Sequence, residues 1–151
     1  MITVKTITSG EPSAQMLDML KQYASVPDDS RDVLLAGLLR RAVDQVQQAA
    51  DRTIVPSILE VTRTEWDGEP VRLYQDPDET ISVEVDGREV DYTIDGRILT
   101  PHMVGKGITV RYQTKADEAT ASQLTAVVLQ YATALYDGQD TATLTSILNQ
   151  C

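Results

Sequence analysis

The stretch DDSRDVLLAGLLRRAVDQVQQAADRTI, residues 28–54, predicts one long amphipathic helix followed by a stop. Its apolar residues recur at the i, i+3, i+4, i+7 spacing of a helix with one broad apolar face. They are Leu34, Leu35, Leu38, Leu39, Ala42, Val43, Val46, Ala49 and Ala50. Before them, Asp28-Asp29-Ser30 offers side-chain oxygens to the free N–H groups of a helix start. Pro56 cannot continue a helix, so the helix is expected to cover about residues 31–52.

Two further segments repeat this helical spacing. One is expected over about residues 12–24, where the apolar positions are Met16, Leu17, Leu20, Tyr23 and Ala24. The other is expected over residues 117–136, where they are Leu124, Val127, Val128, Tyr131, Leu135 and Tyr136. Asp137-Gly138 is a suitable C-terminal stop for the second helix. The link at Pro27 is so short that the first two helices should pack as a hairpin.

Between the helices the period of the apolar residues changes to two, which predicts strands within residues 57–112. The Asp86-Gly87 and Asp95-Gly96 pairs are tight-turn signals between alternating segments. Such alternation indicates antiparallel hairpins with one buried face. At the N-terminus, Ile2, Val4 and Ile7 are consistent with a short strand or an extended arm.

The predicted fold class is therefore α+β. We expect mainly a helical bundle, built from the helical hairpin and the long C-terminal helix. A small antiparallel β-sheet would be inserted between the helices. Residues 1–138 would form the main domain, and residues 139–151 a separate C-terminal segment.

Composition limits the classes of function. The 151 residues suit one domain with a real core, and no run approaches the roughly 20 apolar residues of a membrane span. The N-terminus MITVKTITSG lacks a basic start and an apolar signal core, so we expect neither a membrane nor a secreted location. With 13 basic and 23 acidic residues, the net charge is −10. This charge disfavours gripping DNA or RNA, but it suits a passage through which DNA slides.

No group of residues assembles a reaction centre. His102 is the only histidine and has no positioned partner in sequence, and the terminal Cys151 has no neighbouring cation. Asp76, Asp78 and Glu79 could hold a hard cation, but Pro77 favours a solvated turn. The segment Gly105–Gly107 lacks the remaining residues of a phosphate loop. We therefore predict no catalytic, cofactor-binding or metal-binding residue, and no cofactor.

Two features are candidates for binding a partner. Trp66 could anchor a partner, since tryptophan is favoured at interface centres, or it could equally close the sheet core. Leu144, Ile147 and Leu148 give the C-terminal segment one apolar edge. That short segment must either dock on a partner or fold back on its own bundle, because it is too short to be stable alone.

The order of elements resembles the head–tail connector (adaptor) family of tailed phages and related gene-transfer particles. The resemblance covers about Glu11 to Tyr136. Residues 28–35 and 40–46, an acidic cap followed by a leucine-rich helix, resemble the family's long helix. Residues 107–112 resemble the strand before the last long helix, and residues 124–136 resemble that helix with its late tyrosine.

The resemblance implies a structural neck protein of a tailed phage or phage-like particle, located in the virion and assembled in the host cytoplasm. It implies a homo-oligomeric ring, commonly of twelve copies, beneath the portal protein. Such a ring extends the DNA channel without specific DNA binding and offers a platform to a downstream neck or tail protein. The C-terminal segment would then dock on the portal or on a neighbouring subunit. Neither a cofactor nor catalysis is implied.

Two other classes stay open. One is another neck or tail-completion protein, also a ring former but with a sheet-dominated fold, which helix content would distinguish. The other is a small enzyme with an unrecognised site, which a pocket with convergent polar groups and perturbed carboxylates would reveal.

Overall fold

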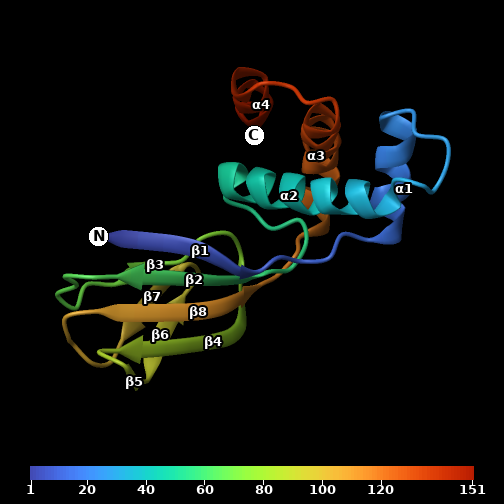
Figure 1. Cartoon of the computed structure of the whole chain (residues 1–151). Helices are drawn as coiled ribbons and strands as arrows, with labels where there is room; N and C mark the ends of the chain where they lie inside the picture. Colours follow the sequence, from blue (N-terminus) through green and yellow to red (C-terminus); the bar gives the residue numbers. More distant parts are fainter. The chain divides into compact units, whose positions relative to one another are not determined.

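The structure is a computed structural model that describes the backbone of residues 1–151 and every side chain except those of Glu79 and Thr80. Contacts divide the chain into two units (Figure 1). We call residues 1–9 and 56–115 the sheet unit, and residues 10–55 and 116–151 the helical unit.

The sheet unit is built on a five-stranded antiparallel sheet. Its strands, in the order in which they pair, are β1 (Ile2–Thr8), β2 (Ile58–Arg63), β8 (Ile108–Thr114), β4 (Pro77–Val85) and β5 (Arg88–Glu89). The Asp86-Gly87 turn between β4 and β5 has positive φ at both residues, as the sequence predicts for a two-residue hairpin. The central strand β8 alternates between buried and exposed residues along its length.

A second antiparallel sheet covers one face of the first (Figure 1). It consists of β3 (Val71–Arg72), β7 (Ile98–Pro101) and β6 (Tyr92–Asp95), in that pairing order. The inward residues of both sheets form one apolar core, whose largest members include Tyr112, Leu73 and Leu99. The Tyr112 hydroxyl accepts a hydrogen bond from the Tyr74 N–H at 2.8 Å and donates one to the Tyr74 carbonyl at 2.9 Å. This pair of bonds satisfies a hydroxyl that the core buries.

The fold is α+β, as predicted, but the expectation of a small sheet inserted into a mainly helical bundle is wrong. Across the described backbone the sheets contain eight strands, and they have a core of their own. Strand β1 confirms the short strand that was one of two alternatives for the N-terminus, but it lies outside the range 57–112 that was predicted for the sheet, and β8 extends to Thr114. The local pattern missed this size because β1 is stabilised by β2, which follows it by more than 50 residues.

The helical unit contains α1 (Ala14–Tyr23), α2 (Asp32–Ala50), α3 (Glu118–Tyr136) and α4 (Thr141–Leu148). The first three agree with the predicted helices to within two residues at each end, and each of them contacts the other two. The buried stripe of α2 contains Leu35, Leu39, Ala42, Val43 and Val46, whereas Leu38 is only half-buried. Gly138 ends α3 with a positive φ and donates its N–H to the Leu135 carbonyl, so the predicted stop is confirmed.

The start of α2 differs from the prediction. Its N-cap residue is Arg31, which makes no side-chain cap. The carboxylates of Asp29 and Asp32 instead bind the Lys21 ammonium of α1, with 3.0 Å between Nζ and the Asp32 Oδ1. The hydrogen bond to Asp29, and then that to Asp32, raise the pKa of Lys21. The acidic residues before the helix therefore join α1 to α2.

A buried amide closes the other end of α2. Gln47 is 1% exposed, and its Oε1 accepts hydrogen bonds from the N–H groups of Ile54 and Val55, both at 2.7 Å. Asp51 reverses the chain with a left-handed backbone between the helix and these two residues. The Gln47 side chain thus accepts hydrogen bonds from two N–H groups of the segment that follows the helix.

None of the helices described is both long enough and apolar enough to span a bilayer.

The buried stripe of α2 gives a direct stability test. Leu39→Ala should lower the free energy of unfolding by about 2–5 kcal/mol, because it leaves a cavity beside a fully buried side chain. Leu34→Ala on the same helix is the control, since Leu34 is 51% exposed and should change stability by less than about 0.5 kcal/mol. Chemical denaturation measures both. Equal losses for the two variants would show that α2 does not bury this face.

Candidate functional site

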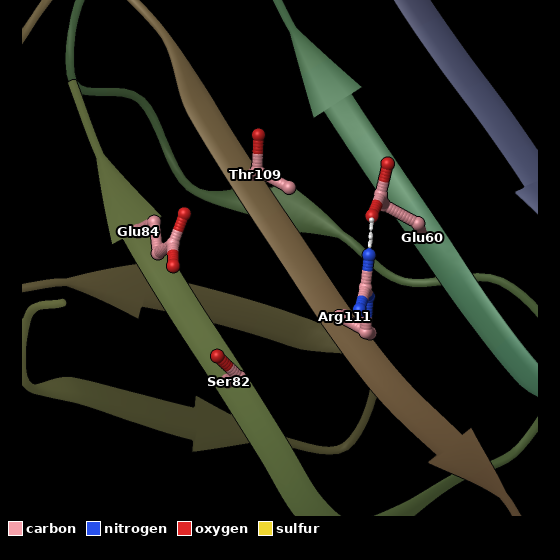
Figure 2. Close-up of a pocket in the computed structure, with 5 residues that line it drawn as sticks. All are labelled: Glu60, Ser82, Glu84, Thr109 and Arg111. Atoms are coloured by element: carbon pink, nitrogen blue, oxygen red, sulfur yellow. Dashed lines mark hydrogen bonds and ion pairs between the residues drawn. The ribbon is translucent and has the colours of Figure 1, made fainter. Parts of the chain in front are cut away.

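The outer face of the five-stranded sheet carries a row of polar side chains over a hollow of about 160 Å³ (Figure 2). Glu60 projects from β2, Arg111 and Thr109 from β8, and Ser82 and Glu84 from β4. These residues share one face because paired strands point opposite residues to the same side. The face opposite the core is therefore polar throughout its centre.

Glu60 is the centre of charge on this face. Its Oε2 accepts hydrogen bonds from Arg111 Nη2 at 2.7 Å and Nε at 3.2 Å, and its Oε1 lies 3.6 Å from the Lys5 Nζ. The Glu60 side chain is only 13% exposed. The hydrogen bond to Arg111 and the neighbouring positive charges lower the pKa of Glu60 from its ordinary value of 4.5. The carboxylate is therefore ionised at neutral pH and poorly suited to donate a proton in catalysis.

The two candidate nucleophile or base residues have no catalytic surroundings. His102 is exposed, and its Nε2 lies 2.7 Å from the Thr93 hydroxyl. A threonine hydroxyl cannot stabilise an imidazolium ion as a carboxylate would. Burial raises the pKa of the Cys151 thiol, which lowers the fraction of reactive thiolate. The expectation that neither residue is catalytic stays a prediction.

Of the three candidate cation ligands, Asp76 is bound by an arginine. Asp76 Oδ1 accepts a hydrogen bond from Arg97 Nη2 at 3.1 Å, and the side chain of Glu79 lies outside the described residues. Among the side chains that the structure describes, no three His, Cys, Asp or Glu residues gather in a metal-binding cluster.

The segment Gly105–Gly107 does not form a phosphate cradle. The N–H groups of Lys106 and Gly107 donate to the Asp86 carboxylate at 2.9–3.2 Å. A Cβ on Gly105 would come within 2.4 Å of Asp86 Oδ2, so this position requires glycine. The side chain of Asp86 therefore occupies the place that an anion would need.

Trp66, the first candidate for partner binding, lies in the core of the sheet unit. It is 3% exposed, and its indole N–H donates to the Glu69 carbonyl at 2.7 Å. Its backbone N–H donates to the carbonyl of Lys106 at 2.8 Å. This burial supports the alternative in which Trp66 closes the sheet core. The Trp66 side chain has almost no exposed surface with which to bind a partner.

The second candidate group lies on α4. Leu144, Ile147 and Leu148 are half-buried and pack against the core of the helical unit. Asp140 caps α4 by accepting a hydrogen bond from the Thr143 N–H at 2.9 Å. The trio thus lies on one face of a docked helix within its own unit, which is the second of the alternatives that the sequence leaves open. Residues 139–151 belong to the helical unit.

Sequence reasoning missed the polar row around Glu60. Its signal is the alternation itself: the odd-numbered apolar residues of β2 and the even-numbered apolar residues of β8 point inward, so Glu60 and Arg111 must point outward. The pairing of these two residues depends on the register between strands 50 residues apart, which the sequence does not reveal.

Comparisons with known proteins find likeness in structure only. No protein-family model matches the sequence, and no curated protein matches it. The fold is similar to a chain of the virion of a native gene transfer agent (GTA) particle, with 12% identity and a TM-score of 0.66. It is equally similar to a chain of the neck of an empty GTA particle computed with C6 symmetry, with 14% identity and a TM-score of 0.66. Each comparison covers 98% of this chain and 94% of the other.

At this level of identity the likeness shows the fold. It extends over nearly the full length of both chains, so it includes the sheet unit, the helical unit and the order in which the chain builds them. The chain therefore shares its overall fold with these chains of GTA particles.

Glu60 gives a test of the polar row. Glu60→Gln should lower the free energy of unfolding at pH 7 by about 1 kcal/mol or less, because the two cations that pair with Glu60, Lys5 and Arg111, are themselves more than half exposed to solvent. The folded state lowers the pKa of Glu60, so this stability is present above pH 4.5 and is lost as the pH falls through the folded-state pKa.

Denaturation of parent and variant from pH 7 to pH 3 measures the difference. Glu84→Gln is the control, since among the described side chains Glu84 has no ion-pair partner on the same face. A gap between parent and Glu60→Gln that persists unchanged at pH 3 would contradict the ion pair.

Proposed function

We propose that the chain is a structural neck protein of a tailed phage or phage-like particle. It forms a homo-oligomeric ring beneath the portal, commonly of twelve copies, extends the DNA channel and links the head to the tail. Its partners are other copies of itself, the portal protein and a downstream neck or tail protein. It has no catalytic role and needs no cofactor.

The observation that carries this proposal is the fold likeness over 98% of the chain to chains of a GTA virion and of a GTA neck. The neck chain comes from an assembly with C6 symmetry. A ring whose copies are related by rotation needs one subunit with two different, complementary faces.

The charge of the chain fits a channel component. A net charge of −10 repels the phosphates of DNA, so DNA can pass without being held. On the outer face of the five-stranded sheet, the cations Lys5 and Arg111 both pair with the Glu60 carboxylate, so they do not offer DNA a free basic surface.

The two other classes are less well supported. A sheet-dominated neck or tail-completion protein does not fit the helical unit, since more residues lie in helices than in strands. An enzyme would need convergent groups tuned for proton transfer. The carboxylate at the centre of the polar hollow instead has a lowered pKa and a bound arginine.

The proposal is tested by imaging the purified protein alone and mixed with the portal of the same particle. We expect rings that stack coaxially on one end of the portal and an open channel through both. Portals that stay bare at concentrations well above those of the virion neck, in the presence of folded protein, would overturn the proposal.

We also propose a role for the C-terminal helix in portal attachment, and truncation at Gly138 separates this role from packing within the subunit. Removal of α4 exposes the core surface that Leu144, Ile147 and Leu148 half-cover, so the melting temperature should fall. A double substitution of the exposed α4 residue Thr145 and the exposed C-cap Asn149, both to Asp, should leave the melting temperature nearly unchanged and weaken portal binding in co-sedimentation. Normal portal binding by both proteins would restrict α4 to an internal role.

A further inference from the structure

Strand β1 presents a free edge. It pairs with β2 on one side only, as the first strand of the five-stranded sheet. The N and O atoms of Met1 both bond to Thr64, at 3.2 and 3.1 Å. Backbone groups in an antiparallel pair alternate in direction, so Thr3 and Lys5 also turn theirs toward β2. Ile2, Val4 and Thr6 therefore turn their N–H and C=O groups away from the sheet.

The same strand exposes apolar side chains on the core face. Val4 lies opposite Val61 of β2, which is 1% exposed, so Val4 and Ile2 point to the side of the core. Yet Ile2 is 53% exposed and Val4 41% exposed. A long edge strand with uncovered apolar residues pairs readily with another chain.

A groove of complementary character lies across the sheet unit from β1. It is formed between β4 and β6, has a volume of about 290 Å³, and contains Ile81, Tyr92 and Ile94. Ile94 lies opposite the fully buried Leu99, so it faces the core side, but it is still 38% exposed. This volume is at or below the roughly 300–1,000 Å³ of small-molecule sites, so an aliphatic side chain is a better occupant than a larger ligand.

Strand β6 also has a free edge at this groove. It is the last strand of the three-stranded sheet, and the bond from the His102 N–H to the Asp91 carbonyl fixes the alternation of its backbone. Thr93 and Asp95 turn their backbone groups toward β7, whereas Tyr92 and Ile94 turn theirs outward. An incoming strand could therefore bond to β6 while its side chains enter the groove.

We propose that β1 of one copy of this chain lies in the groove between β4 and β6 of the next copy. The outward backbone groups of Ile2, Val4 and Thr6 pair with those of Tyr92 and Ile94. The side chains of Ile2 and Val4 fill the groove. Strand addition of this kind takes affinity from main-chain hydrogen bonds and specificity from alternate side chains.

A second copy is the occupant that the observations favour. The strand ITVKTIT has no acidic residue in a chain of net charge −10, and its one charged residue, Lys5, pairs with Glu60. Contact through this strand avoids the repulsion that two acidic surfaces would suffer. β1 and β4 are separated by two strands of the same sheet, so donor and groove form a head-to-tail contact that can close into a ring. The inference rests on the proposed ring.

Cross-linking tests the contact directly. One protein carries Val4→Cys and the other Ile94→Cys, both with Cys151→Ser to remove the native thiol. We expect a disulfide-linked pair when the two proteins are mixed and oxidised, and none with either protein alone. A chain with both cysteines should give a ladder of covalent oligomers. Linkage of Val4→Cys to itself would mean that two β1 edges pair with each other, and it would overturn the proposal.

Variants test whether the ring uses this contact. Val4→Pro removes an outward N–H that β2 does not use, so the subunit should fold and rings should be lost at concentrations where the parent forms them. Ile94→Asp should do the same. Ile98→Asp is the matched control, because Ile98 is 45% exposed and lies opposite Asp95 on the other face of the hairpin. Melting curves identify any variant that unfolds.

The outcomes separate this inference from the proposed function. Normal rings from folded Val4→Pro and Ile94→Asp, together with no cross-link between copies, would overturn the strand contact and leave the neck function standing. Failure of the parent to form rings or bind portals would overturn the neck function, while the mixed cross-link would still report whether β1 enters the groove.

Discussion

The sheet unit depends on the pairing of β8 with a strand on each side. β8 pairs with β2 over six residue pairs on one side and pairs with β4 on the other. Both its neighbours therefore fix which of its residues point inward, and a shift of one residue would turn Val110 and Tyr112 out of the core. The Tyr112 hydroxyl adds a further constraint, because its two bonds to Tyr74 are made only in this register. The polar outer face is the other consequence of the same alternation.

The antiparallel order of β1, β2 and β8 also decides how the two units are joined. The chain leaves the sheet unit after Ser9, returns at Pro56 and leaves again after Lys115. These three positions follow the end of β1, precede the start of β2 and follow the end of β8. In neighbouring antiparallel strands all three lie at the same end of the sheet. The opposite end holds the turn at Asp86 and the loops of residues 64–70 and 102–107.

The parts of the fold that local sequence predicted are those that local physics determines. Helix α2 follows from its apolar spacing, and the hairpin at Asp86-Gly87 follows from residues that tolerate positive φ. The missed parts depend on distant partners. The residues of β1 do not show that β2 is its partner strand. Likewise, the sequence does not show that the Asp29 carboxylate binds Lys21 and not the start of a helix. From the sequence alone, Gln47 would be assigned to the polar surface of the helix. In the structure, the chain reversal at Asp51 places the N–H groups of Ile54 and Val55 against its side-chain amide.

The same distinction holds for the candidate sites. The prediction that His102 and Cys151 are not catalytic rests on composition, since the chain has one of each. The place of Trp66 was not, because its burial follows from a backbone bond to Lys106, forty residues away. The edge of β1 and the groove near Ile94 are likewise products of register, and no motif marks them.

The burial of Trp66 makes the two units spectroscopically distinct. It is the only tryptophan of the chain and lies in the core of the sheet unit, while most of the far-ultraviolet circular dichroism comes from the four helices. Intrinsic fluorescence therefore reports the melting of the sheets, and ellipticity reports chiefly the melting of the helices. Coincident transitions would mean that the joined units unfold as one cooperative body, and separated transitions would give each unit its own stability.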